Sequence, residues 1–370
     1  MALASGCNLY FEDAPGGGAP AADSGPHAPD DLALPCLRTL STADVRADDG
    51  EQLFVSYSCE GASVIADVFH ADGALIANDP RADFQQRFAR VFTGDLDGRA
   101  PVDVLLFPED AAIGWAFMRR DFGGGSGYSV DMGRRVDDVA IADLDGDGKS
   151  DFVVAGGDAL VAFPDAVAML NTFSAWPATA LPVGAHGTFV SAAVAPLGGS
   201  AAPDVFFVAR EANGSFGLGT AIQTGWDPAA FTVTKVAEPE GPLHGLRVAD
   251  VDGDGIDDVI GLARRIFVRG SKHGRLAFLD EAAASLAIGD VDGDGRVEAV
   301  FITHAHASVR RVRVDASGAT LALSSELLSS TGGDQVVVAD VDDDGRGDLV
   351  LARDLGQPSS TLRLVRGPTF

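Results

Sequence analysis

Short apolar runs alternate with acidic, glycine-containing stretches along most of the chain. Apolar residues flank the acidic stretch 143–151 on both sides, and the same order returns around 250–258, 290–298 and 340–348. Short apolar runs bounded by turn residues are typical of buried β-strands. No long window shows the 3.6-residue apolar period of an amphipathic helix. We therefore expect an all-β protein that is built from a repeated unit.

The four acidic stretches carry oxygen-bearing side chains at alternate positions. Positions 1, 3 and 5 are Asp in every copy, position 9 is Asp or Glu, and position 6 is always Gly, which permits the positive φ of a sharp turn. Position 7 offers its backbone carbonyl. Because Ca²⁺ takes six to eight oxygen ligands, each stretch is a predicted calcium loop. The predicted ligands are Asp143, Asp145, Asp147, Lys149 and Asp151; Asp250, Asp252, Asp254, Ile256 and Asp258; Asp290, Asp292, Asp294, Arg296 and Glu298; and Asp340, Asp342, Asp344, Arg346 and Asp348.

Two other kinds of loop share part of this pattern. An EF-hand needs a bidentate Glu at position 12 and a helix after it. Position 12 here is Val154, Gly261, Phe301 or Leu351, and the residues around it are β-rich. The second alternative is an acidic β-turn without metal, which the fourfold repetition of the same ligand positions disfavours. Mg²⁺ is disfavoured because it demands a stricter octahedron and keeps its waters.

Three further stretches keep the frame of the repeat but lose acids. They begin at Asp44, Asp95 and Pro196, and an apolar run follows each of them. In the second stretch Arg99 stands at position 5, where its guanidinium could pair with neighbouring carboxylates in place of an ion. Whether these three loops bind an ion is left open.

The seven stretches begin about 40 to 54 residues apart, which accommodates four short strands per repeat. Small four-stranded sheets arranged radially make a β-propeller, so we expect seven blades, with six as the alternative. The β-rich runs 159–164, 265–270 and 361–366 are the predicted third strands. We expect residues 32–40 to supply the outer strand of the last blade and so to close the ring.

The repeated Asp-x-Asp-Gly-Asp-Gly-x-x-Asp loop between strands resembles FG-GAP/VCBS-type repeats, which build the seven-bladed propeller of integrin α-subunit head domains. The likeness covers roughly residues 31–370. It implies Ca²⁺ in the loops that join the first and second strands, on one face of the ring. The implied ligands are the four carboxylates of each intact loop.

The charge of the chain limits its partners. Of 370 residues, 54 are Asp or Glu and 27 are Lys or Arg, for a formal charge of −27. Such a surface repels nucleic acid and anionic lipid, so we expect neither as a partner. No run approaches the roughly 18 apolar residues of a membrane helix. We expect a monomer outside the cell or at its surface, where millimolar calcium suits weak modular sites.

The N-terminal region and the cysteines bear on localisation. Residues 1–30 are rich in Pro, Gly, Ala and Asp and predict a flexible leader or tether ahead of a propeller over 31–370. Cys7 follows Ala-Ser-Gly, as in the lipidation site of a bacterial lipoprotein signal, but the basic and apolar regions of such a signal are missing. Cys36 and Cys59 form either a disulfide or two buried thiols.

Other candidate chemistry is sparse. His304 and His306 alternate in the run after the third intact loop, which predicts both on one face of a strand. A third metal ligand is missing, so we interpret them as polar residues at a strand end. The glycine-rich run 123–127 lacks the Lys and Ser or Thr of a phosphate loop and is expected to be a loop between strands.

These observations favour a non-catalytic, calcium-binding β-propeller that acts as a protein-interaction or adhesion module and binds an unidentified protein or glycan. One alternative is a lectin-like propeller, which requires exposed Trp115, Trp176 or Trp226, although packing between blades is the commoner role for such residues. The other is a hydrolase or lyase with a site on the central channel. It requires carboxylates with perturbed pKa values away from the calcium loops.

Overall fold

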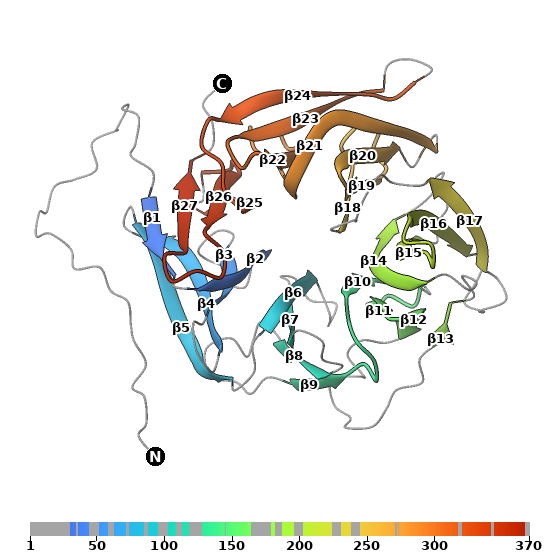
Figure 1. The fold of residues 1–370 in the computed structure, drawn as a ribbon, viewed down its shortest axis with the longest axis horizontal. Helices are drawn as coiled ribbons and strands as arrows, with labels where there is room; N and C mark the ends of the chain where they lie inside the picture. The colour runs from blue at the N-terminus through green and yellow to red at the C-terminus, as the bar shows by residue number, and fades with distance from the viewer. Residues whose placement is uncertain are drawn as a thin grey trace, which may run out of the picture.

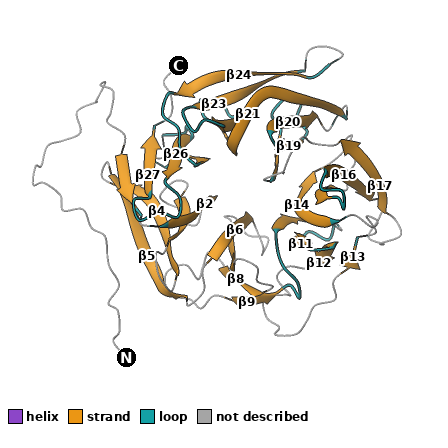
Figure 2. Ribbon diagram, viewed as in Figure 1, coloured by secondary structure: helices purple, strands orange, loops and turns teal. Residues whose placement is uncertain are grey.

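The regular elements of the structure are all β-strands. The computed structural model describes residues 30–34, 36–43, 52–57, 63–71, 74–84, 88–94, 103–108, 113–117, 128–144, 146–163, 179–181, 187–195, 203–223, 231–237, 245–270, 272, 274–316, 320–341 and 344–366. Within these ranges only loops and turns connect the strands (Figure 2), and no helix capable of crossing a membrane occurs. The leader 1–29, Cys7, Cys59, Asp145, Asp342, Trp176, Trp226 and the run 123–127 lie outside the described residues.

The strands form small antiparallel sheets arranged in a ring (Figure 1). Five of these sheets have four strands and one has seven. In the seven-stranded sheet, β21 (Arg275–Gly289) pairs with β20 through its first half and with β22 through its second half. That sheet is therefore two four-stranded units that share one long strand. The described strands group into seven such units, and the predicted β-propeller fold is confirmed.

Units 1 to 3 follow one another along the chain. Unit 1 contains β2 (Leu37–Ala43), β3 (Gln52–Tyr57), β4 (Ser63–Ala71) and β5 (Ala74–Phe84). Unit 2 contains β6 (Phe88–Gly94), β7 (Asp103–Pro108), β8 (Ile113–Phe117) and β9 (Tyr128–Asp131). Unit 3 contains β10 (Asp138–Ala142), β11 (Asp151–Gly156), β12 (Ala159–Phe163) and β13 (Thr179–Ala180).

Units 4 to 7 complete the ring. Unit 4 contains β14 (Thr188–Ala195), β15 (Asp204–Arg210), β16 (Phe216–Gln223) and β17 (Phe231–Ala237). Unit 5 contains β18 (Leu246–Ala249), β19 (Asp258–Leu262), β20 (Arg265–Gly270) and the first half of β21. Unit 6 contains the second half of β21 with β22 (Glu298–Thr303), β23 (Val309–Asp315) and β24 (Ala322–Ser329). Unit 7 contains β25 (Gln335–Ala339), β26 (Asp348–Arg353), β27 (Thr361–Val365) and β1 (Asp30–Ala33).

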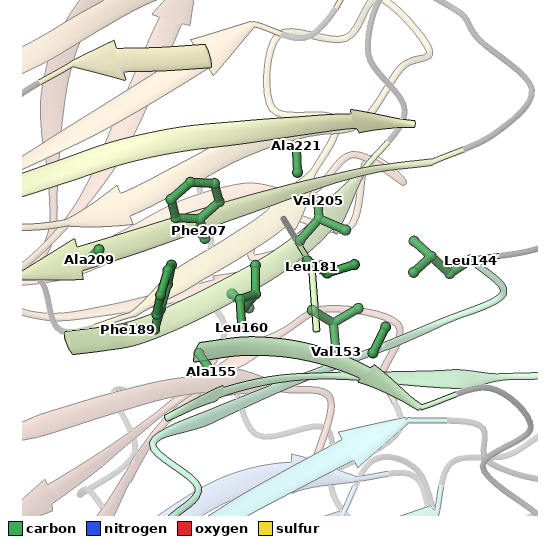
Figure 3. Packing of buried hydrophobic residues seen from close by; sticks show 12 residues of the cluster. Leu144, Val153, Ala155, Leu160, Leu181, Phe189, Val205, Phe207, Ala209 and Ala221 are labelled. Carbon is green, nitrogen blue, oxygen red and sulfur yellow. The ribbon is translucent and has the colours of Figure 1, made fainter. Parts of the chain in front are cut away.

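The hydrophobic core is divided among the spaces between neighbouring units. One buried cluster joins units 3 and 4, with Val153 and Leu160 facing Phe189 and Phe207 (Figure 3). The other five clusters lie in the same way between successive pairs from units 2 and 3 round to units 7 and 1. The described side chains of second strands β11, β15, β19 and β26 are buried along nearly the whole strand, because each of these blades packs against two neighbours. This explains their continuous apolar runs in the sequence.

The ring closes across its ends, but not as the sequence predicted. β1 pairs antiparallel with β27, whereas Leu37–Ala43 is the first strand of unit 1. Residues 32–40 are therefore not one strand. The chain turns between β1 and β2, where Leu37 donates its N–H to the carbonyl of Leu34 at 3.1 Å. Cys36 has a φ of 58° and donates its N–H to the carbonyl of Gln357 at 2.7 Å. Cys36 is disulfide-bonded, and both other cysteines lie outside the described residues.

The first strands line a central cavity of about 760 Å³. Its walls come from β2, β6, β10, β14, β18, the second half of β21, and β25, so every described unit contributes its first strand. The cavity and the acidic loops are thus different parts of the ring: the loops begin where these strands end.

Candidate metal centre

All seven predicted loops occupy the same place in their units. The first strands end at Ala43, Gly94, Ala142, Ala195, Ala249, Gly289 and Ala339, directly before position 1 of each loop. The second strands begin at Gln52, Asp103, Asp151, Asp204, Asp258, Glu298 and Asp348, which are the position 9 residues. The intact loops, as equivalent turns of a radial array, lie on one face of the ring. For the degenerate loops, most of whose residues lie outside the described ranges, only the bounding strands fit the predicted frame.

Backbone N–H groups hold the position 1 carboxylate of each intact loop. In loop 250–258, Asp250 Oδ1 accepts from Gly253 and Oδ2 accepts from Gly255, both at 2.8 Å. Loops 143–151 and 290–298 repeat the two bonds at 2.7–2.9 Å. In all four intact loops, the carboxylate at position 5 accepts from the backbone of position 7 at 2.9–3.0 Å. An ionised carboxylate oxygen has more than one lone pair, so these bonds leave room for a ligand.

Glycine is required where the loops turn back. The position 6 glycines have φ between 81° and 84°, as predicted. In three loops the position 4 glycine also has positive φ, from 74° to 78°, which the sequence analysis did not anticipate. Two left-handed residues in close succession turn the acidic side chains of positions 1, 3 and 5 inward.

The position 9 acid closes each loop from inside the sheet. Asp151, Asp258 and Asp348 are 1 % exposed or less. Each accepts the N–H of position 2 of its loop, as Asp258 does from Val251 at 3.2 Å. Glu298 does the same from Val291 at 3.0 Å. A buried carboxylate is costly unless a cation or several donors compensate it.

Two of the loops bring three acids close enough to share an ion. The carboxylate oxygens of Asp250, Asp252 and Asp254 lie within 4.8 Å of one another, and those of Asp290, Asp292 and Asp294 do likewise. Oδ2 of Asp254 and Oδ1 of Asp292 are buried and have no hydrogen-bond partner. These oxygens fit a hard divalent cation, since a buried acceptor without a donor is what an ion would satisfy. The other two intact loops each contain an Asp outside the described residues.

Neighbouring loops contact one another through their position 7 side chains. A Cβ added to Gly253 would lie 3.5 Å from Nη1 of Arg296, and one added to Gly293 would lie 2.8 Å from Cγ of Arg346. The N–H of Gly347 also donates to the carbonyl of Asp290 at 2.6 Å. Each of these arginines therefore lies against the preceding loop. The two side chains that were predicted to offer only a carbonyl also pack the loops together.

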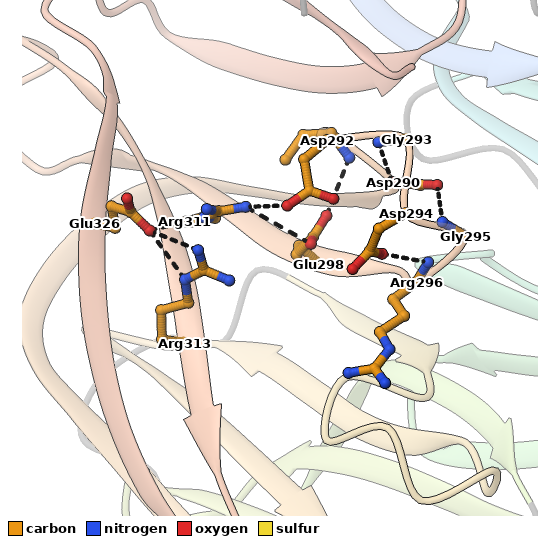
Figure 4. Close-up of polar contacts among 11 residues, drawn as sticks. Asp290, Asp292, Gly293, Asp294, Gly295, Arg296, Glu298, Arg311, Arg313 and Glu326 are labelled. Carbon is orange, nitrogen blue, oxygen red and sulfur yellow. Dashed lines mark hydrogen bonds and ion pairs between the residues drawn. The ribbon is translucent and has the colours of Figure 1, made fainter. Parts of the chain in front are cut away.

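A buried cation that the sequence did not predict lies against loop 290–298. Arg311 on β23 is 3 % exposed and contacts Asp292 at 2.7 Å, Glu298 at 3.7 Å and Glu326 at 3.0 Å (Figure 4). Burial raises the pKa of Glu298, and the neighbouring Asp292 raises it further, against the backbone bond from Val291 and the charge of Arg311. The sequence signal is weak, because Arg311 lies two strands away from Asp292 and only the strand register brings them together.

A second arginine lies beside a degenerate loop. Arg269 on β20 donates from Nη1 to Thr220 Oγ1 at 2.8 Å and lies 5.3 Å from the centre of the Phe206 ring. Burial lowers the pKa of Arg269, and the charge of Asp204 opposes this effect. Asp204 is the surviving position 9 acid of the loop that begins at Pro196. Guanidinium groups thus approach position 9 acids in two units.

The two histidines are not in a strand, and the prediction that they share one strand face is wrong. β22 ends at Thr303, and His304 and His306 lie in the turn that follows. His306 has a φ of 56°, and its Nδ1 lies 2.9 Å from the carbonyl of Gly333 and 3.2 Å from Oδ1 of Asp334. The turn reverses the chain within this short segment. His306 is therefore engaged with unit 7.

The central cavity contains one carboxylate with a raised pKa. Burial raises the pKa of Asp138 at the start of β10, while its hydrogen bond from Ser191 opposes the shift. Oδ2 of Asp138 also accepts the N–H of Ala192 at 3.1 Å, and Oγ of Ser191 accepts the N–H of Leu246 at 3.0 Å. The hydroxyl and the carboxylate are thus used to join units 3, 4 and 5. We assign no catalytic role to them.

Comparisons with known proteins support the fold. No family model matches the chain, and no curated protein matches its sequence. A crystal structure of BBS1N in complex with ARL6DN, soaked with lead, superposes with a TM-score of 0.58 at 12 % identity. The match covers 94 % of this chain and 96 % of that one. At this identity the likeness shows the β-propeller fold alone.

Proposed function

We propose that the chain is a non-catalytic β-propeller of the FG-GAP/VCBS type, whose loops bind calcium and which acts as a protein-interaction module outside the cell or at its surface. The observation that carries the proposal is loop 250–258. There three carboxylates converge, a fourth lies buried at position 9, and Asp254 Oδ2 is buried without a hydrogen-bond donor. Calcium would supply the missing positive charge and the missing partner.

The acidic surface that the fold exposes supports a role in protein interaction. The loops place acidic side chains on one face of a rigid ring, and the chain as a whole carries a formal charge of −27. A partner with a basic surface would be attracted to this face. BBS1N, which has a similar fold, was crystallised in a complex with another protein, so a ring of this kind can serve as a docking platform.

The described residues favour the interaction module over the two alternative functions. The lectin-like hypothesis depends on three tryptophans, of which Trp115 lies in β8 without a described side chain and the others lie outside the described residues. The enzyme hypothesis requires a perturbed carboxylate away from the loops. Asp138 meets that condition, but its hydrogen bonds are those of a strand junction.

The proposal is tested by thermal unfolding in EDTA and then in graded calcium, for the unaltered chain and for Asp254→Asn. We expect calcium to raise the melting temperature of the unaltered chain, because an ion at 100 times its dissociation constant stabilises the folded state by about 2.7 kcal/mol. Asp254→Asn should reduce the response, since it removes one charged ligand while it keeps a similar shape. A melting temperature that is the same in EDTA and in calcium would exclude structural calcium.

A further inference from the structure

Arg311 supplies a fixed positive charge to loop 290–298. Its guanidinium donates from Nη1 to Oδ2 of Asp292 at 2.7 Å and lies 3.7 Å from Oε1 of Glu298 (Figure 4). Asp292 and Glu298 occupy positions 3 and 9, so two of the four ligand carboxylates already face a cation. The third partner, Glu326 on β24, holds Nε of Arg311 at 3.0 Å from the other side.

This arginine is peculiar to unit 6. It lies directly opposite Val300, the third residue of the second strand. The residues at the same register in the other units with intact loops are Ala162, Val268 and Leu364. All three are uncharged and at most 1 % exposed. The four loops look alike in sequence, but only one of them has a buried guanidinium at this place.

Elsewhere in the ring, a guanidinium approaches the acid of a loop that has lost its ligand set. Arg269 is half-buried beside Asp204, whose loop retains only the position 9 acid. Burying both groups is tolerable because each offsets part of the desolvation cost of the other. In unit 4, therefore, a guanidinium lies near the position 9 acid of a loop that lacks a full set of calcium ligands.

We propose that Arg311 is the built-in counter-ion of loop 290–298, so that this loop keeps its conformation without calcium, whereas loop 250–258 depends on a bound ion. The inference rests on the proposed calcium-binding function. It assigns different behaviour to two loops for which the sequence predicts the same ligand positions. The guanidinium lies 2.7 Å from Asp292 and 3.7 Å from Glu298, where its charge repels an incoming dication. It also occupies Oδ2 of Asp292, so that this carboxylate has only Oδ1 to offer an ion. Near Asp254 the described residues place a more weakly held cation, Lys272, whose Nζ lies 3.7 Å from Oδ2 and whose side chain is half exposed.

The first test counts bound calcium by isothermal titration calorimetry, with full-length protein and calcium alone as the probe. Asp254→Asn and Asp294→Asn are matched, because each keeps the acceptor for the position 7 N–H and removes one charge at position 5. We expect Asp254→Asn to bind one ion fewer than the unaltered chain and Asp294→Asn to bind the same number. An equal loss of one ion in both variants would overturn the proposal. This arm does not require any change to Arg311.

The second test adds a site. Arg311→Met keeps most of the buried volume but removes the charge, so Asp292 and Glu298 should become ligands. We expect one ion more than the unaltered chain, a lower melting temperature in EDTA and recovery in calcium. Arg313→Gln is the control, because Arg313 also contacts Glu326, at 2.9 Å, but not the loop. If Arg311→Met folds and binds no additional ion, the proposal fails.

The two tests separate this inference from the calcium function itself. If the unaltered chain and Asp254→Asn both bind no ion, the proposed function fails. A single ion gained by Arg311→Met would then still support the role of Arg311, and no gain would refute it as well.

Discussion

At the scale of single residues, two glycines allow a phenylalanine ring to lie flat across a strand pair. Gly261 lies opposite Phe267, and Gly219 lies opposite Phe207. A Cβ on Gly261 would come within 2.1 Å of the Phe267 ring, and one on Gly219 within 2.3 Å of the Phe207 ring. Both rings are 1 % exposed, so they have no free space to move into. The absence of a side chain is thus part of the packing between units.

Gly261→Ala should lower the free energy of unfolding by roughly 1–3 kcal/mol, because the methyl group overpacks a closed core. Chemical denaturation measures the loss. Phe267→Leu would relieve the overlap, so the double variant should lose less stability than the two single variants added together. Strict additivity would contradict a direct clash between the two side chains.

The acidic loops show which residues sequence alone can place. The positive φ of Gly255 was predicted correctly, and Asp250 lies in the predicted loop, because both features are local: the carboxylate and the N–H groups that it accepts lie within one loop. The calcium role of Asp250 stays a prediction. Arg311 could not be predicted, because its contact with Asp292 depends on the register of β22 with β23. Local spacing therefore groups the carboxylates, but the arginine that contacts two of them is placed by tertiary structure.

At the scale of elements, serine side chains join the first strands of successive units around the cavity. Ser191 on β14 accepts the N–H of Leu246 on β18, and Ser285 on β21 accepts the N–H of Val336 on β25 at 3.1 Å. Both serines are largely buried and follow a register irregularity in their strands. The irregularity turns the hydroxyl toward the next unit, which supplies a partner for a buried backbone donor.

Ser191→Ala should destabilise the protein by about 1–3 kcal/mol, since it leaves a buried N–H of Leu246 without an acceptor. It also removes the hydroxyl that lowers the pKa of Asp138. The folded-state pKa of Asp138 already lies above its unfolded value of 3.8, so its ionisation costs stability as the pH rises from 3.8 through the folded pKa.

Ser191→Ala should therefore lower the free energy of unfolding more at neutral pH than near pH 3 to 4. Urea unfolding at several pH values would measure this difference. Ser285→Ala is the matched control. It loses one backbone partner, and the described contacts of Ser285 include no carboxylate, so its loss should not depend on pH in this way. Equal pH profiles for the two variants would contradict the role of Asp138.

The sequence predicted the elements well where a loop of fixed length separates them. Third strands were expected at 265–270 and 361–366, and β20 and β27 lie there. The short step between the loops at 250 and 290 was harder to explain. It arises because β21 runs without a turn from the outer edge of unit 5 to the inner edge of unit 6. A strand that belongs to two sheets leaves no turn signal in the sequence.

At the scale of the whole molecule, the ring depends on a strand from the opposite end of the chain. β1 supplies the fourth strand of unit 7 (Figure 1). Leu32 packs in the cluster between units 7 and 1. The sequence predicted this closure from the missing outer strand of the last repeat, but it placed the closing strand too far along. The turn at Cys36 that ends β1 has a positive φ at a residue other than Gly, which composition does not reveal.

The ion pair between Asp31 and Arg363 joins the two strands that close the ring. Asp31 lies opposite Arg363 and accepts two hydrogen bonds from its guanidinium, each of 2.7 Å. These bonds hold the pKa of Asp31 below its usual value of 3.8. A carboxyl group whose folded pKa is depressed stabilises the fold fully above its unfolded pKa, and the stabilisation is lost as the pH falls through the folded pKa. The relevant window is therefore below about pH 4.

Asp31→Asn should lower the free energy of unfolding by up to about 1 kcal/mol at neutral pH, a modest value because Asp31 is 44 % exposed and water screens the pair. The difference from the unaltered chain should shrink as the pH falls below about 4, because both proteins then lack the charge on residue 31. Asp280→Asn removes an equal charge from a pair in which Asp280 is 98 % exposed, and it should leave stability unchanged at neutral pH. If Asp31→Asn behaved as Asp280→Asn does, the ion pair would contribute nothing to closure, and β1 would be held by its backbone bonds and Leu32 alone.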